Sequence, residues 1–135
     1  MLLSSIEEVP GPIRSPEGGW ATAAVADGRL VVEVGCGDPL DEVVVRSFAV
    51  GAAHMALGWV TSEALSVDDD GTVGDLTIRS FGIPRAVDTP PVEVIVADEA
   101  GPPVNGSDAV FAAVAAAVWR HQGHPPEWPT RRPLR

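Results

Sequence analysis

A small number of side chains in this sequence could do chemistry, and the first of them is a single cysteine. Cys36 lies between Gly35 and Gly37, a setting that exposes the backbone and could present a reactive thiol. No histidine or lysine lies near it in the sequence to lower the pKa of the thiol. The pattern therefore favours a small apolar side chain at the end of a strand over a nucleophile.

The three histidines show no spacing that predicts a metal centre. His54 lies in an apolar stretch without a second ligand four residues away, which favours a hydrogen-bonded histidine in a core or an interface. His121 and His124 are three residues apart, a spacing that could hold zinc, but no second pair of ligands accompanies them. We predict structural roles for all three and no metal site.

An acidic turn, Asp68-Asp69-Asp70-Gly71, resembles the beginning of a calcium loop. A calcium loop needs further oxygen ligands at fixed offsets and a distal glutamate, and Val73, Leu76 and Ile78 occupy that region instead. No serine lies in a nucleophile-elbow sequence, so acyl transfer has no candidate triad. These residues predict no catalytic group.

Length and charge limit the class of protein. A chain of 135 residues and 14.0 kDa is long enough for one hydrophobic core. The net charge of −10, with no run of basic residues, would repel nucleic acid and anionic membranes. One cysteine makes no internal disulfide, Met1-Leu2-Leu3 does not begin a signal peptide, and Arg46 and His54 interrupt the longest apolar run. We expect a soluble, cytoplasmic protein without nucleic-acid or membrane partners.

The candidate residues must be positioned by a central helix predicted over residues 38–65. Asp38-Pro39 and the acidic Asp41-Glu42 are typical of a helix N-terminus, where free N–H groups and the positive end of the helix dipole favour them. Apolar residues on all sides predict a helix that is covered nearly all round. One face carries Val44, Phe48, Gly51, Ala52, Met55 and Trp59, and little of the other side is polar because it carries Val43, Val45, Val50, Leu57 and Val60. Glycines at 51 and 58 predict close approach by another segment.

The N-terminal part of the chain predicts an extended lead-in and a hairpin. Residues 1–19 are too rich in proline and glycine for a helix or a sheet ladder. Residues 20–26 and 29–34 read as strands, and Asp27-Gly28 between them suits a tight hairpin turn.

The second half of the chain adds a hairpin, a strand and a helix. Residues 63–67 and 72–80 are predicted as strands around the acidic turn, and residues 92–96 as a strand in mid-sheet. A helix capped by Ser107 or Asn105 is expected over residues 108–121, followed by an extended proline-rich tail. The buried stripe predicted for this helix is Val110, Phe111, Val114, Val118 and Trp119. The order predicts an α+β fold, with a mostly antiparallel sheet of hairpins packed against two helices, as one domain over residues 20–135.

Five short stretches resemble, in the same order, motifs of one known family. They are GCGDPL at 35–40 (family "DCG..LNP"), the glycines at 51 and 58 ("EGG..QGLG"), Glu63-Ala64-Leu65 with the Asp-Gly turn ("TEEL....DG"), FGIPRAVDTPPVEV at 81–94 ("DYRIPTAADIPPIEV") and Pro102-Pro103 with Gly106 ("GEPPLLGAAPAIANAI"). From about Trp20 onward the chain is similar to the C-terminal part of the large, molybdopterin-binding subunit of the xanthine dehydrogenase, aldehyde oxidase and carbon monoxide dehydrogenase family.

The resemblance implies a catalytic base that this chain lacks. In the family a glutamate directly before the Pro-Pro deprotonates a molybdenum-bound hydroxyl, and Gly101 stands at that position here. Glu99, two residues earlier, could serve only if the loop were remodelled, because a base must lie within hydrogen-bond reach of the proton it takes. We expect the Gly101 loop to border a concavity facing the N-terminal part of the central helix. Gly101→Glu should cost less than about 1 kcal/mol unless Gly101 has a positive φ.

Cofactor contacts implied by the family are also changed. Phe48 and Met55 stand where the family helix carries glutamines, and Gly35 stands where its turn begins with aspartate. Asp41-Glu42 adds negative charge near the expected position of an anionic pterin phosphate. We therefore expect no cofactor on the isolated chain, and molybdopterin only if the chain assembles with a partner.

Three functions fit these patterns. The first is a free-standing, non-catalytic relative of the family subdomain that acts as an auxiliary or interaction subunit. The alternative is one piece of a split oxidoreductase that completes a molybdopterin pocket with a partner chain, so the sequence leaves open whether the assembly is an enzyme. The third is a small-ligand module with a shallow pocket beside Gly51 and Gly58. We expect either a homo-oligomer or a complex with a larger molybdenum hydroxylase-type subunit, formed through Phe48, Met55 and Trp59.

Overall fold

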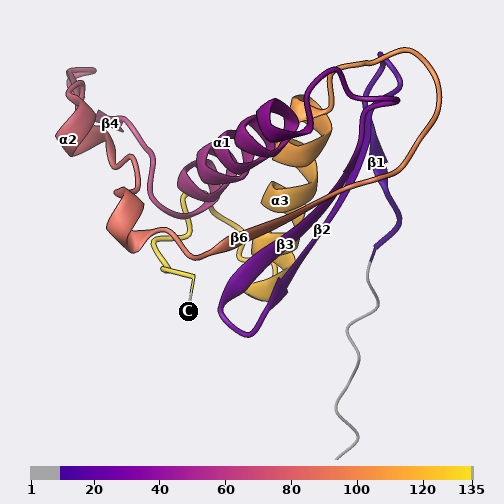
Figure 1. The fold of residues 1–135 in the computed structure, drawn as a ribbon. Coiled ribbons are helices and arrows are strands. Elements are labelled where there is room, and N and C mark those ends of the chain that lie inside the picture. The colour runs from indigo at the N-terminus through magenta and orange to yellow at the C-terminus, as the bar shows by residue number, and fades with distance from the viewer. Residues whose placement is uncertain (1–9, 135) are drawn as a thin grey trace, which may run out of the picture.

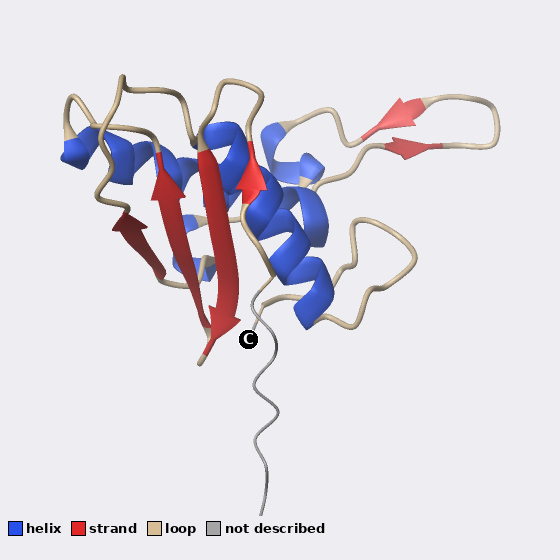
Figure 2. Ribbon diagram, turned by 90° about the vertical axis from the view of Figure 1, so that its right-hand side faces the viewer, coloured by secondary structure: helices blue, strands red, loops and turns tan. Residues whose placement is uncertain are grey.

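The computed structural model describes residues 10–134, and two long helices lie on one face of its four-stranded sheet (Figures 1 and 2). The first nine residues of the predicted lead-in lie outside the described range. The elements are β1 (Ile13–Arg14), β2 (Trp20–Ala26), β3 (Arg29–Gly35), α1 (Glu42–Thr61), β4 (Ser66–Val67), β5 (Val73–Gly74), α2 (Ile78–Phe81), a 3-10 turn (Ala86–Asp88), β6 (Val92–Val96) and α3 (Ser107–His121). The α+β class is confirmed.

The sheet has the order β1-β2-β3-β6, in which only β3 and β6 are parallel. The predicted first hairpin is confirmed, and Asp27 and Gly28 both have a positive φ. The mid-sheet position predicted for residues 92–96 is wrong, because β6 is an edge strand. Its apolar sequence reflects the neighbouring helix: α1 packs against β6, and the Arg46 guanidinium donates a hydrogen bond to the Val94 carbonyl.

The predicted lead-in contributes a strand, which corrects the expectation that residues 1–19 form no sheet ladder. Ile13 and Arg14 pair with Ala21 and Trp20. The chain then turns back at once, with the Ser15 amide donating to the Gly19 carbonyl at 2.7 Å. The prolines at 10, 12 and 16 flank the two paired residues and therefore do not interrupt the ladder.

The second hairpin is shorter than predicted, and it projects from the rest of the fold (Figure 2). β4 and β5 have two residues each, so the strand predicted over 72–80 is wrong beyond Gly74. Thr77 and Ser80 form a capping box, in which Thr77 Oγ1 accepts from the Ser80 amide at 3.2 Å. That local arrangement begins the four-residue helix α2 where a strand was expected.

The central helix starts later than predicted. Asp41, and not Asp38, caps it: its carboxylate accepts hydrogen bonds from the Val43 and Val44 amides at 2.9 and 3.2 Å. Gly58 is closely approached, as expected, by Glu63 and Pro84.

The prediction that α1 is covered nearly all round is wrong, and of the face that carries Val44, Phe48 and Met55 only Ala52 is buried. The buried side consists mainly of alanines with Leu57 and Val60, whereas Phe48, Met55 and Trp59 are 64%, 61% and 50% exposed. No other segment of the described chain comes within 4 Å of a Cβ built at Gly51. A helix that is apolar all round carries no pattern to mark its inner face, and α3, itself rich in alanine, packs on the smallest side chains.

The last helix agrees with the prediction in extent and in its buried side. Val110, Val114 and Val118 are fully buried. The preceding N-cap residue is Gly106, which corrects the expected Ser107 or Asn105. After α3 the tail returns to α1, where the Thr130 and Arg131 amides donate to carbonyls of the last α1 turn. Trp128 packs edge-on against Trp59 at 5.1 Å between ring centroids.

The composition of α1 differs from the sequence expectation in one further respect. With 20 residues, α1 is long and apolar enough to cross a membrane by length and composition alone, despite Arg46 and His54. Core helices of soluble proteins meet the same criterion, and α1 packs against α3 and β6 in this fold.

We expect Val114→Ala to lower the free energy of unfolding by about 2 kcal/mol, because two buried methyl groups are lost and a cavity remains. Val87→Ala is the matched control, since Val87 is 81% exposed and its truncation should change stability by less than about 0.5 kcal/mol. Urea unfolding followed by circular dichroism measures both. Equal effects of the two substitutions would contradict this core.

Candidate functional site

A cavity of about 260 Å³ lies between the N-terminal half of α1, the turn after β3 and the loop before α3. Its walls are mostly apolar and include Leu40, Phe48, Pro103 and Val110. The expected concavity beside the Gly101-Pro102-Pro103 loop is therefore present, and it faces the N-terminal part of α1. Asp41 is the one charged residue among its lining residues.

Glu99, at the start of the Gly101-Pro102-Pro103 loop, is held by two hydrogen bonds. One carboxylate oxygen accepts a hydrogen bond from the Trp20 indole N–H, and the other accepts one from the Gly37 amide at 3.1 Å. The side chain thereby ties the start of β2 to the turn between β3 and α1. Glu99 does not line the cavity, so its carboxylate is used for structure at the place where a remodelled loop would need it as a base.

The loop itself approaches the turn backbone to backbone. Gly37 has φ +72°, and a Cβ there would collide with the Pro102 carbonyl oxygen. The Asp38 amide donates to the Gly101 carbonyl at 3.0 Å. Gly101 is exposed, has φ +108°, and has no atom within 4 Å of a Cβ built on it. Gly101 thus lies in a tight, exposed turn.

Cys36 lies beside this contact and is 3% exposed. Burial raises the pKa of its thiol, and the negative charge of Glu99 raises it further. The thiol is therefore held in its neutral, weakly nucleophilic form, which supports the structural role predicted for it.

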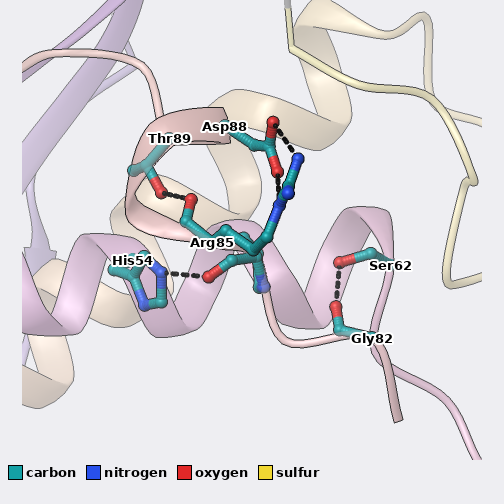
Figure 3. A network of polar contacts seen from close by, with 7 residues as sticks. His54, Ser62, Gly82, Arg85, Asp88 and Thr89 are labelled. Carbon is teal, nitrogen blue, oxygen red and sulfur yellow. Dashed lines mark hydrogen bonds and ion pairs between the residues drawn. The ribbon is translucent and has the colours of Figure 1, made fainter. Parts of the chain in front are cut away.

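His54 contacts the segment between α2 and the 3-10 turn and so holds that segment against α1, as Figure 3 shows. Its Nε2 lies 2.9 Å from the Pro84 carbonyl oxygen, and the Ser62 hydroxyl donates to the Gly82 carbonyl at 2.6 Å. The Arg85 guanidinium pairs with Asp88 at 2.6 Å, and its hydrogen bond lowers the pKa of the Asp88 carboxyl. His54 is thus a hydrogen-bonded histidine between α1 and the segment that contains Pro84.

The third possibility, a shallow pocket beside the helix glycines, is met only in part. A second cavity of about 390 Å³ is lined by Leu57, Pro84 and Arg131, next to Gly58. Gly51 lines neither of the two cavities. Burial raises the pKa of the Glu63 carboxyl, which lies beside Gly58.

The remaining candidates, His124 and the acidic turn, make local structural contacts. The His124 ring packs edge-on against Trp119 at 4.5 Å between centroids. In the acidic turn the Thr72 amide donates to Asp70 at 3.0 Å, and hydrogen bonds from Thr72 lower the pKa of the Asp70 carboxyl. Within residues 10–134, no three His, Cys, Asp or Glu side chains lie close enough together to hold a metal ion.

An apolar face of α1 is exposed, as the interaction surface predicted from Phe48, Met55 and Trp59 requires. We call Val44, Phe48, Gly51, Met55 and Trp59 the α1 stripe; every one of them is exposed. The signal was present in the three- and four-residue spacing of these residues, but the same spacing is typical of a buried face. Phe48 and Val44 also line the cavity, so the two features are continuous.

Comparisons with known proteins give a fold and no close relative. No protein-family model and no curated protein sequence matches this chain. Among solved structures, similar folds occur in the reconstituted CO dehydrogenase from Oligotropha carboxidovorans (TM-score 0.61, 16% identity), a Cu,Mo-CO dehydrogenase in its carbon monoxide reduced state (0.54, 18%) and quinoline 2-oxidoreductase from Pseudomonas putida 86 (0.60, 21%).

Each match covers 74% of this chain but 14% of the much longer neighbour. At this level of identity the likeness shows the fold alone. The chain therefore has a fold that forms a small part of a molybdenum- and copper-containing CO dehydrogenase and of quinoline 2-oxidoreductase.

We expect Glu99→Ala to lower the free energy of unfolding by about 2 kcal/mol, because it removes two hydrogen bonds to a charged, partly buried acceptor. Glu93→Ala is the control, since its ion pair with Arg29 is half exposed and should be worth less than about 1 kcal/mol. Denaturant unfolding gives both values. A Glu99→Ala chain as stable as Glu93→Ala would show that the carboxylate does not hold this loop.

Restoring the family base should be costly, contrary to the small cost expected for an ordinary loop position. Gly101→Glu is expected to destabilise the fold by about 1–3 kcal/mol, because φ +108° is strained for a residue with a Cβ. Ala100→Glu adds the same charge to the exposed neighbouring position and should cost less than about 0.5 kcal/mol. The difference between the two melting temperatures measures the strain, and it should vanish if Gly101 can adopt a negative φ freely.

Proposed function

We propose that this chain is a non-catalytic relative of the C-terminal subdomain of a molybdenum hydroxylase large subunit, acting as an auxiliary or interaction subunit in the cytoplasm. The observation that carries the proposal is the state of the loop before Pro102-Pro103. Gly101 stands at the position of the base, and the nearby carboxylate of Glu99 is engaged by Trp20 and Gly37. A base must reach the proton that it takes, and neither residue meets that condition.

The fold implies a molybdopterin cofactor, and the residues around the cavity do not fit it. A pterin phosphate is anionic and is normally met by cationic or N–H donors. Here the cavity is lined mostly by apolar side chains, and its one charged lining residue is the acidic Asp41. Two of the free N–H groups of the first α1 turn, those of Val43 and Val44, already donate to the Asp41 carboxylate. No catalytic step is therefore assigned to this chain.

An interaction role is supported by the exposed apolar surface. In the similar structures this fold is 14% of a longer chain, so much of its surface belongs beside other segments. In the isolated chain Phe48, Met55 and Trp59 are exposed where such contacts would be made. A contiguous apolar patch on a protein surface usually marks an interaction site.

Molybdenum and pterin content of the purified chain tests the proposal. We expect far less than one molybdenum per chain by metal analysis and no pterin fluorescence after oxidation, in the wild type and in Gly101→Glu alike. Neither protein should hydroxylate aldehydes or purines, since a base without a metal-bound hydroxyl has no proton to take.

Stoichiometric cofactor in the wild-type chain would overturn the proposal, as would turnover that depends on Glu99. Two results together would favour the alternative, a split oxidoreductase. The tagged chain would retain a larger polypeptide that carries the other molybdopterin motifs, and hydroxylase activity would appear only in that complex.

A further inference from the structure

The α1 stripe is an apolar surface with a glycine near its centre. Phe48 and Met55 lie on either side of Gly51 along the helix, and the stripe contains no charged side chain. The space above Gly51 is open within the described chain. A helix interior seldom carries an exposed glycine, which costs about 1 kcal/mol relative to alanine, unless another backbone comes close to it.

The stripe is nearly symmetric when read in either direction. Phe48 and Met55 stand at equal distances from the point between Gly51 and Ala52, and so do Val44 and Trp59. An antiparallel copy of the same helix would therefore place Phe48 against Met55 of the second copy and Val44 against Trp59. Self-complementarity of this kind is what a two-fold symmetric interface requires.

We propose that the α1 stripe is the interface of a two-fold symmetric homodimer, in which the α1 helices of two copies cross antiparallel at Gly51. The proposal names the partner of the interaction surface put forward above, and so it rests on that proposed function. Small residues at the crossing point allow close approach of two helices, with the larger side chains packing on both sides.

The charges at the two ends of α1 favour this orientation. Asp38, Asp41 and Glu42 lie at the N-terminal end. At the C-terminal end lies Arg131, whose amide donates to the Thr61 carbonyl at 2.9 Å, followed by Arg132. Of the acids near this end, Asp88 pairs with Arg85 and Glu63 is partly buried beside Gly58, whereas Glu127, next to Trp128, is exposed. An antiparallel copy brings acidic and basic ends together and opposes the helix dipoles, whereas a parallel copy would bring like charges together.

The available apolar area suits a dimer of ordinary size. A stable interface buries about 800 Å² on each partner. Phe48, Met55 and Trp59 are each at least half exposed, and Leu40, just before the N-terminal end of the helix, is more exposed still. A monomer seldom leaves an apolar patch of more than a few hundred Å² uncovered.

Size-exclusion chromatography with light scattering tests the dimer. The wild type should have twice the 14.0 kDa mass of the chain, and Gly51→Arg should have the mass of one chain. The variant should fold, because the site is open and arginine favours a helix over glycine. Val50→Arg is the matched control on the same helix, since Val50 points away from the stripe, and it should remain dimeric. Circular dichroism checks that all three are folded.

Disulfide trapping tests the orientation. A mixture of Phe48→Cys and Met55→Cys chains should form the mixed disulfide in preference to either homodisulfide, while the buried Cys36 stays unreacted. A wild-type monomer at all concentrations, a dimeric Gly51→Arg chain, or a dominant Phe48→Cys homodisulfide would each overturn the proposal. A monomer free of molybdenum would contradict the dimer but agree with the non-catalytic role. A dimer with stoichiometric cofactor would agree with the dimer but contradict the non-catalytic role.

Discussion

The structure depends on the close packing of two alanine-rich helices over a four-stranded sheet. The largest fully buried side chains are Leu30 and a set of valines, and the facing sides of α1 and α3 are mostly alanine. Small side chains bring the backbones close but bury little apolar area per residue, so the core stabilises the fold only modestly. The same geometry leaves Phe48, Met55 and Trp59 at least half exposed on the surface.

A second constraint fixes the opposite side of the cavity. The Glu99 carboxylate joins Trp20 to Gly37, and the glycine lets the Pro102 carbonyl lie against the turn. This arrangement keeps the shape of the loop without a carboxylate at Gly101. The positive φ at Gly101 disfavours any residue with a Cβ at this position.

Local chemistry decided which elements could be predicted. The Asp27-Gly28 hairpin and the buried side of α3 follow from turn residues and a one-sided apolar pattern, and both agree with the structure. The edge position of β6 and the pairing of Ile13–Arg14 depend on which strand reaches which neighbour, and no local pattern records that. The inner face of α1 was missed because every face is apolar. Of the site, the concavity followed from the family resemblance, but the hydrogen bonds of Glu99 join residues far apart in the sequence.

The cavity and the α1 stripe share Val44 and Phe48, so what happens at one affects the other. A second copy seated on the stripe covers the outer side of Phe48, which forms part of the cavity wall, and thereby restricts the wall's movement. A small apolar molecule entering the cavity would act on the same side chain from within. Such coupling is reciprocal in free energy: if dimerisation weakens binding in the cavity, binding weakens the dimer by the same factor. Phe48 is apolar, and an apolar side chain shared by two surfaces is better suited to this coupling than to holding an anionic group.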